Sequence, residues 1–133
     1  MPFAKIYFAE DRFDEERQGR LSTAVQDALM NTLGAPPADF FQALFALPAA
    51  RFPHSAGFVG CTYSDDLIVL EVIFITGRSK ETRLALHRDL NARIVAATGI
   101  SPDDLLITLL ETPGENLSFG KGLAQRADAV IAP

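Results

Sequence analysis

The sequence predicts an α+β (layered α/β) fold built from a tandem β-α-β repeat, with two helices on one face of a four-stranded mixed sheet. The first observation is that the chain matches itself: RFDEER, beginning at Arg12, aligns with RSKETR, beginning at Arg78, at an offset of 66 residues. LGAPPAD and TGISPDD align at an offset of 65, which pairs Asp39 with Asp104. The second observation is that these matches recur at the same junctions between strand-like and helix-like segments, as the marks of a duplicated unit should. We place the one extra residue in the first helix.

The first unit, residues 2–47, has the pattern of a strand, a helix and a second strand. Its first strand is predicted at Phe3–Phe8, and Glu15 then opens an acidic first helical turn, where carboxylates complement the helix dipole. The apolar face of that helix consists of Leu21, Val25, Ala28 and Leu29. Gly34 stands where a left-handed residue should end the helix, and the second strand is predicted at Phe40–Leu47.

The second unit, residues 67–111, repeats this pattern. Its first strand is predicted at Leu67–Ile75, and Ser79 can cap the helix that follows. The apolar face of this helix consists of Leu86, Leu90, Ile94 and Ala97. Gly99 should end the helix, and the last strand is predicted at Leu105–Leu110. Because a helical crossover joins strands in parallel, we expect both strand pairs to be parallel.

The other face of the sheet is expected to need a partner, because two helices can cover only one face of four strands. The predicted strands LIVLEVIFI and LLITLL are apolar on both faces, which favours an oligomer whose sheets enclose a shared core. Between the units, Pro48–Ser64 has the composition of a loop or short strand. The tail after Glu111 suits a turn or hairpin and a loose C-terminus, and we predict a single domain over residues 1–133.

Composition argues against several classes of function. The chain has 133 residues and a net charge of −5 without a basic stripe, so nucleic acid is not an expected partner. Its longest apolar run, Leu67–Ile75, is interrupted by Glu71 and is too short to span a membrane. There is no signal-peptide pattern and Cys61 is alone, so we expect a cytoplasmic protein with a buried, unpaired cysteine. His54 and His87 are far apart and belong to no Cys/His cluster, so no metal is expected. There is also no P-loop and no GxGxxG motif after a strand, and no cofactor is expected.

Three residues remain as candidates for chemistry. Pro2 directly follows Met1, and removal of Met1 would free its ring nitrogen as a secondary amine; alternatively, Pro2 is simply tolerated at the first position of a strand. Asp39 lies in the loop before a strand, and Arg78 lies where a strand meets a helix N-terminus. Strand ends are where such sheets gather ligands. Each also has a plain structural interpretation, Asp39 as a turn residue and Arg78 as a solvated charge.

Several features occur together: a proline directly after Met1, a duplicated β-α-β unit, and the stretches PPADFFQ, GRSKETR and ENLSFGKG. This combination resembles the tautomerase superfamily, and most of all the branch of malonate semialdehyde decarboxylase and its tautomerase relatives. The resemblance runs from Pro2 to about Gln125. It implies a homotrimer of tandem β-α-β subunits, an amino-terminal proline in each active site and a small carboxylate-bearing substrate.

The resemblance also implies roles for single residues. Pro2 matches the catalytic proline, Asp39 the acidic residue of the PPxDxxQ stretch, and Arg78 the arginine of the GRS turn. Phe119 matches an aromatic residue that lines the substrate pocket.

Three further pocket positions depart from the decarboxylase pattern. Thr76 stands in place of a second arginine, Leu117 in place of a tryptophan, and Arg126 in place of a later aromatic residue. The missing arginine weakens the case for the decarboxylase's own substrate. Arg126 either supplies a second cation for the substrate or is a plain surface charge.

These residues are consistent with general acid–base catalysis. An α-amino group titrates near about pH 8, and an apolar pocket with a nearby arginine would lower the pKa of a freed Pro2 nitrogen. That nitrogen could then move a proton between carbon and oxygen, while Arg78 holds a carboxylate or developing oxyanion. The sequence therefore predicts an enol–keto tautomerase. Two alternatives stay open: decarboxylation or hydration, in which Asp39 activates water, and a trimeric binding or scaffold protein without the chemistry.

Overall fold

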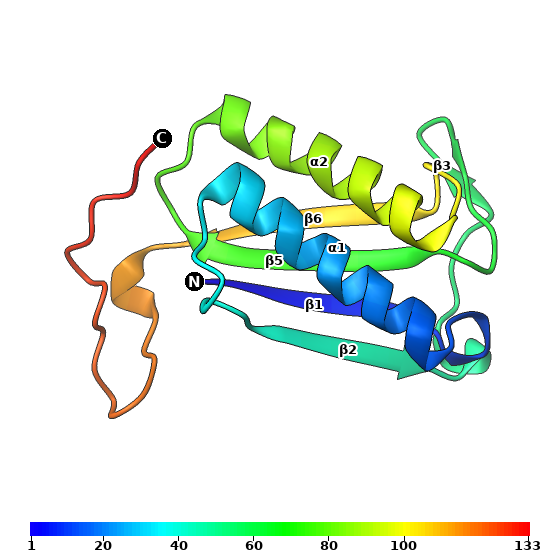
Figure 1. Ribbon diagram of the computed structural model, residues 1–133, viewed down its shortest axis with the longest axis horizontal. Helices are drawn as coiled ribbons and strands as arrows, with labels where there is room; N and C mark the ends of the chain where they lie inside the picture. The colour runs from blue at the N-terminus through cyan, green and yellow to red at the C-terminus, as the bar shows by residue number, and fades with distance from the viewer.

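Four strands form one mixed sheet, and two helices lie side by side across one of its faces (Figure 1). The computed structural model describes residues 1–133, and the strand order in the sheet is β2-β1-β5-β6. The strands of the sheet are β1 (Pro2–Ala9), β2 (Gln42–Leu47), β5 (Ile68–Ile75) and β6 (Leu105–Thr112). The helices are α1 (Glu15–Leu33) and α2 (Lys80–Thr98). Neither helix combines the length and the apolar character needed to cross a membrane.

Strand pairing confirms the two predicted β-α-β units. β1 pairs with β2 and β5 pairs with β6 in parallel, whereas β1 and β5 are antiparallel and join the units into one sheet. The predicted strand boundaries differ from the observed ones by one or two residues, and the two largest differences are that β2 begins at Gln42 and not at Phe40 and that β6 ends at Thr112 and not at Leu110. Phe40 belongs to the loop, and the carbonyl of Phe41 accepts the Ala4 N–H at 3.0 Å just before the β1–β2 ladder begins.

Both helices end at the glycines that the repeat singles out. Gly34 has φ +69° and Gly99 has φ +76°, the left-handed region that glycine enters without a Cβ clash. At the other end of α2, the Ser79 side chain accepts a main-chain N–H three residues on at 3.1 Å, which confirms it as the cap. Asp14 caps α1 in the same way at 2.8 Å.

The extra residue of the first unit lies before α1 and not within it, so its predicted placement in the helix is wrong. Both helices have 19 residues. Arg12 precedes the start of α1 by three residues, whereas Arg78 precedes the start of α2 by two. Phe13 and Asp14 separate Arg12 from α1, whereas Ser79 alone separates Arg78 from α2, so the additional residue lies between Arg12 and the start of the helix.

The hydrophobic core lies between the sheet and the helices. Alternate residues of β1 and β5 point toward the helices and are buried, as Ile6 and Leu70 illustrate. The intervening side chains point to the opposite side, where Tyr7 stacks on Phe45 with 4.7 Å between ring centroids. We call this side the open face; its apolar residues include Phe3, Tyr7, Phe45, Val69, Ile73, Leu106 and Leu110. Both helices lie on the other side of the sheet, as predicted (Figure 1).

Core burial predicts the cost of truncating α2. Leu90 is fully buried in the core, so Leu90→Ala is expected to lower the free energy of unfolding by about 2–5 kcal/mol. Leu84 on the same helix is 45% exposed, and Leu84→Ala is expected to change that free energy by no more than about 0.5 kcal/mol. Urea unfolding of both variants measures the difference, and equal losses would show that the wrong face of α2 has been assigned to the core.

The segments outside the repeat are short or irregular. The linker carries a small hairpin of β3 (Gly57–Phe58) and β4 (Cys61–Thr62), and Cys61 is unpaired but only half-buried, not buried as predicted. The tail turns back along one end of the sheet (Figure 1). Its end is not loose, because the Ile131 side chain packs against Gly77, which has no Cβ, and the Pro133 carbonyl accepts the Thr82 hydroxyl at 2.9 Å.

Asp104, the repeat partner of Asp39, fixes the end of the linker. It is 2% exposed, and its carboxylate accepts both the main-chain N–H of Ser64, at 2.8 Å, and the Ser64 hydroxyl. Its carbonyl accepts the Ile68 N–H at 2.9 Å, where β5 begins. The buried acid is therefore fully hydrogen-bonded to the segment that leads into the first strand of the second unit.

Candidate active site

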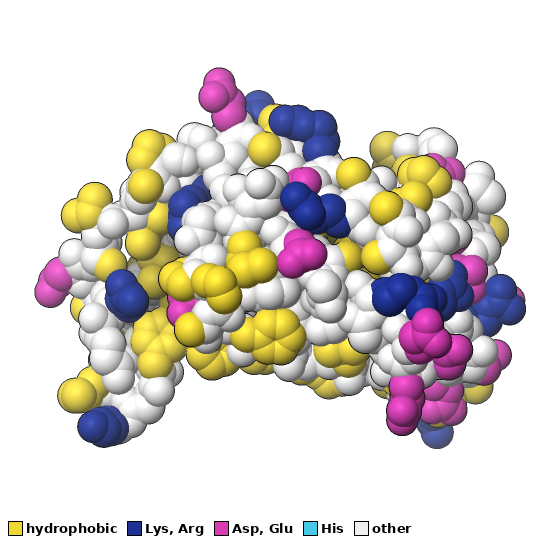
Figure 2. All heavy atoms as spheres, viewed as in Figure 1, with side chains coloured by type: hydrophobic (Ala, Val, Ile, Leu, Met, Phe, Trp, Pro, Cys, Tyr) yellow, Lys and Arg dark blue, Asp and Glu magenta, His cyan; other side chains and the backbone are white.

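A cavity of about 440 Å³ opens at the edge of the sheet where β1 begins. Five of the residues that the sequence singles out line it: Pro2, Asp39, Arg78, Phe119 and Arg126. They come from four separate segments, namely the start of β1, the loop after α1, the turn after β5, and the tail. Figure 2 shows the hollow between the tail and the rest of the chain, with hydrophobic side chains inside it.

Strand directions explain why these segments meet. β1 and β2 are parallel, so both begin at this edge, and the loop that carries Asp39 ends there. β5 is antiparallel to β1 and ends at the same edge, with Phe74 paired to Pro2. Arg78 follows Phe74 by four residues and so reaches the same cavity. The antiparallel union of the two units is therefore what joins Pro2 and Arg78 in one place.

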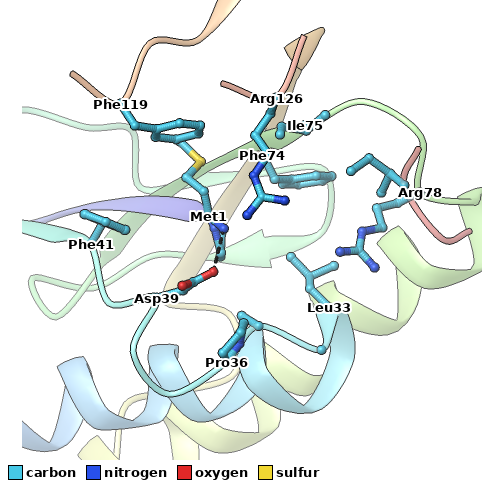
Figure 3. Close-up of a pocket in the computed structure, with 14 residues that line it drawn as sticks. Met1, Leu33, Pro36, Asp39, Phe41, Phe74, Ile75, Arg78, Phe119 and Arg126 are labelled. Carbon is cyan, nitrogen blue, oxygen red and sulfur yellow. Dashed lines mark hydrogen bonds and ion pairs between the residues drawn. The ribbon is translucent and has the colours of Figure 1, made fainter. Parts of the chain in front are cut away.

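Asp39 contacts the nitrogen at the start of the chain. The Met1 amine donates to the Asp39 carboxylate at 2.9 Å (Figure 3), and the side chains of the two residues are 15% and 33% exposed. Helix α1 fixes the loop that carries Asp39. The side-chain amide of Gln26, which is 7% exposed, donates to the Asp39 carbonyl at 3.1 Å. The Asp39 N–H closes a turn onto the Pro36 carbonyl at 2.9 Å. The carboxylate is thus fixed beside the amine by main-chain contacts.

Two arginines of the cavity have no anionic partner in the chain. Arg78 and Arg126 take part in none of its ion pairs, whereas Arg83, one turn further along, pairs with Glu111 at 3.2 Å. In Figure 3 the guanidinium groups of both arginines point into the cavity. Arg78 is half-buried, and partial burial of an unpaired cation strengthens its attraction for an anion, whereas Arg126 is exposed. The cavity therefore has two unused guanidinium groups that can bind a carboxylate or an oxyanion.

The tail supplies one wall through a closed turn. The Gln125 side chain accepts the Phe119 N–H at 3.0 Å and donates to the Gly120 carbonyl at 3.0 Å, which brings the two ends of the turn together. Phe119 and Arg126 stand at these two ends and both line the cavity. Gly114, which is buried, lets the Arg126 backbone approach so closely that a Cβ would clash with it.

Two predicted substrate-binding residues do not line this cavity. Thr76 is exposed, and its N–H donates to the Thr112 carbonyl at 2.9 Å in the continuation of the β5–β6 ladder. Leu117 is half-buried in the tail, one residue after a short 3-10 helix. A role for either in substrate binding stays a prediction.

The cavity also contains residues that sequence reasoning missed. Phe41 belongs to the quoted PPADFFQ stretch, so its place beside Asp39 could have been noticed. Met1 and Ile131 lie at the two ends of the chain and carry no local signal, because only the fold brings them together. The two histidines are elsewhere, and burial in α2 lowers the pKa of His87. No group of three His, Cys, Asp or Glu side chains is placed to hold a metal ion.

Comparisons with known proteins identify the family of the chain. Two family models, both described as "Tautomerase enzyme", match the chain, one over residues 39–120 and the other over residues 2–51. The probable tautomerase YusQ of Bacillus subtilis (strain 168) is 27% identical over 125 residues, which are 94% of this chain and 98% of the relative.

Solved structures are similar over nearly the whole chain. Malonate semialdehyde decarboxylase, solved to explain its decarboxylase and hydratase activities, is 25% identical with a TM-score of 0.82, over 92% of this chain and 94% of its own. The protein named fused 4-OT, solved as a symmetric trimer, is 25% identical with a TM-score of 0.78, over 96% and 98% of the two chains. One family model spans more than half of the sequence. The chain belongs to the tautomerase superfamily of enzymes.

Proposed function

We propose that the protein is a cofactor-independent tautomerase that interconverts the enol and keto forms of a small carboxylate-bearing substrate. Pro2 acts as the general acid–base once Met1 has been removed. The observation that carries the proposal is that Pro2, Asp39 and the unpaired Arg78 line one cavity, in which the Asp39 carboxylate lies 2.9 Å from the amine of Met1, the residue directly before Pro2.

Removal of Met1 turns the Pro2 nitrogen from an amide into a basic secondary amine. Two neighbouring guanidinium groups and the apolar walls favour its neutral form, while the single carboxylate of Asp39 opposes them. The neutral nitrogen takes the proton of the enol hydroxyl and delivers it to the adjacent carbon. One O–H bond breaks and one C–H bond forms, so the substrate changes only its tautomer.

The other residues of the cavity hold the substrate in place. Arg78 binds the carboxylate through paired hydrogen bonds, and Arg126 stabilises the charge that grows on the oxo oxygen. Asp39 accepts a proton of the ammonium form of Pro2 and keeps the amine directed at the substrate.

A second candidate function is decarboxylation of a 3-oxo acid or hydration of a halogenated acrylate. Arg126 favours it, because this residue restores a pair of arginines in the cavity although Thr76 replaces one of those in the decarboxylase pattern. In that reaction Asp39 activates water or protonated Pro2 acts as the acid. Release of carbon dioxide or halide, measured beside ketonisation, separates the two reactions.

The direct test begins with the mass of the intact protein. The expected mass lacks Met1, and the processed protein is expected to accelerate ketonisation of an enol acid followed by ultraviolet absorbance. A retained Met1 leaves the Pro2 nitrogen an amide, which rules out proline catalysis. Processed protein without any such activity leaves the binding or scaffold interpretation as the better one.

The open face supports a proposal for assembly, namely a homotrimer that buries this face. Ile73 belongs to β5, a central strand of the sheet, and lies on the open face. Ile73→Glu is therefore expected to convert a trimer to monomers, because burial of an unpaired carboxylate in the interface costs free energy. Light scattering coupled to size exclusion measures the mass. Thr23→Glu, on the exposed helical side, is the matched control and should leave the trimer intact. A wild-type protein that is monomeric at micromolar concentration would contradict the proposal.

A further inference from the structure

Gln26 is one of three buried residues of the chain with a polar or charged side chain. It lies on α1, is 7% exposed, and donates its side-chain amide to the Asp39 carbonyl at 3.1 Å. The other two are Thr98, which donates to a carbonyl of its own helix, and Asp104, which fixes the linker. A buried amide loses its contacts with water and needs a partner within the protein. Gln26 is the one whose partner belongs to the candidate active site.

The backbone of Asp39 is fixed on both sides of its Cα atom. Its N–H donates to the Pro36 carbonyl at 2.9 Å, and its carbonyl accepts the Gln26 amide. Because both flanking peptide groups are fixed, the Cα–Cβ bond is also fixed in direction, and the carboxylate points into the cavity (Figure 3). Gln26 itself does not line the cavity, so an effect of Gln26 on the chemistry passes through Asp39.

A second anchor on α1 holds the far end of the same segment. The Gln42 side chain accepts the Ser22 hydroxyl at 2.7 Å and donates to the Ser22 carbonyl at 3.0 Å. Ser22 lies four residues before Gln26, which is about one turn of the helix. Loss of the Gln26 amide therefore frees the end of the segment that carries the carboxylate, while the start of β2 stays attached to α1.

The segment is also joined to the strand that begins with Pro2. The Ala4 N–H donates to the Phe41 carbonyl at 3.0 Å. Ala4 follows Pro2 by two residues, and Phe41 follows Asp39 by two residues. This bond and those of the two anchors do not involve Met1, so removal of Met1 leaves the place of the Asp39 backbone relative to Pro2 unchanged.

The second unit of the repeat has a similar contact. Asn91 has the position in α2 that Gln26 has in α1, eleven residues after the first residue of each helix. Its side-chain amide donates to the Pro102 carbonyl at 2.9 Å, two residues before Asp104. Glutamine is longer by one methylene, and in the first unit the amide reaches the carbonyl of the aspartate itself. The contact between helix and loop belongs to both units, but only in the first does it end at a residue of the cavity.

We propose that Gln26 is a positioning residue, which holds the Asp39 carboxylate beside the Pro2 nitrogen by fixing the Asp39 carbonyl. This inference rests on the proposed tautomerase function and adds a residue outside the cavity to it. The charged side chains that line the cavity are those of Asp39, Arg78 and Arg126. Asp39 is the only anion among them, so its displacement removes the one group that favours the protonated form of the Pro2 amine.

The test measures kcat/KM for ketonisation of a 2-oxo enol acid by processed protein across the acidic limb of the pH profile. Gln26→Met keeps the length of the side chain and removes the amide. It is expected to lower kcat/KM by roughly 10- to 100-fold, the effect of a small misplacement of a reacting group. It should also move the acidic limb to lower pH by up to about one unit, because the amine loses a nearby anion.

Asp39→Asn calibrates this shift, because it removes the charge without changing the size of the side chain. It is expected to move the acidic limb in the same direction and at least as far. In protein that already carries Asp39→Asn, Gln26→Met should give no further shift and a smaller loss of kcat/KM, because the charge that Gln26 positions is absent.

Asn91→Leu is the matched control, since it removes an amide of the same kind from the equivalent place in the second unit. It should leave both kcat/KM and the acidic limb unchanged. Gln26→Asn keeps an amide that is one methylene shorter, and it is expected to change both quantities in the same direction as Gln26→Met. Far-UV circular dichroism checks the fold of each variant, and Gln26→Asn decides the question if Gln26→Met does not fold.

The outcomes distinguish the inference from the proposed function. An unchanged acidic limb in both variants of Gln26 overturns the inference, as does an equal loss of kcat/KM with and without the Asp39 carboxylate. A loss in Asn91→Leu as large as that in Gln26→Met also overturns it, because the amide would then serve the fold alone. Processed wild-type protein without turnover, or Pro2→Ala with the wild-type rate, overturns the proposed function itself.

Discussion

Pro2→Ala, in protein whose mass shows that Met1 has been removed, is expected to lower kcat/KM for ketonisation by about 10²-fold or more. A positioned general acid–base contributes about 10² to 10⁴ to a rate, and the effect depends on its basicity and placement. Alanine keeps an amine, but a primary one without the ring that fixes its direction. Stopped-flow absorbance of a 2-oxo enol acid measures the loss, and far-UV circular dichroism checks the fold.

A second variant isolates the nitrogen from the ring. An alanine inserted between Met1 and Pro2 leaves the buried ring in place but keeps its nitrogen an amide after Met1 is removed. This variant is expected to have only background activity. If it retains wild-type turnover, the Pro2 nitrogen is not the catalytic group.

Arg78→Ala is expected to lower kcat/KM by about 10²- to 10³-fold, because the cavity loses a guanidinium group that no carboxylate of the chain neutralises. Arg78→Lys keeps the charge but not the forked pair of donors, so it should recover part of the loss. The loss should appear mainly in KM if Arg78 binds the carboxylate in substrate and transition state alike.

The matched control for charge is Arg88, which is exposed on α2 and does not line the cavity. Arg88→Ala removes the same unit of charge and should leave both kinetic constants unchanged. An unchanged Arg78→Ala enzyme would move the binding of the carboxylate to Arg126, and Arg126→Ala would then carry the whole loss.

The fold could be predicted from local patterns that a single sequence contains. The helix ends at Gly34 and Gly99 could be predicted because a left-handed helix end favours glycine whatever surrounds it. Alternating apolar strands and one apolar helical face predict the layers in the same way. The exact position of the extra residue was not readable, because the connection that contains Glu10–Arg12 has no periodic pattern of its own.

The residues of the candidate site also divide into those with a local sequence signal and those without one. Asp39 and Arg78 could be predicted as site residues, because they follow recognisable helix and strand ends and lie in stretches that resemble a known family. The sequence did not decide whether Arg126 is a cavity residue or a surface charge. Only the closed turn of the tail and the missing side chain of Gly114 bring it to the cavity. Ile131 depends likewise on a contact with Gly77 from a distant segment. Contacts of this kind have no local signal.

Each unit of the repeat has an aspartate that meets a main-chain nitrogen, yet the two nitrogens differ in kind. Asp39 meets the amine at the start of the chain, and Asp104 meets the amide of Ser64 inside it. The lone pair of an amide is delocalised into its carbonyl and cannot act as a base at neutral pH. Joining two copies of the unit end to end therefore doubled the scaffold without doubling the number of basic nitrogens, and the second aspartate was left to serve stability alone.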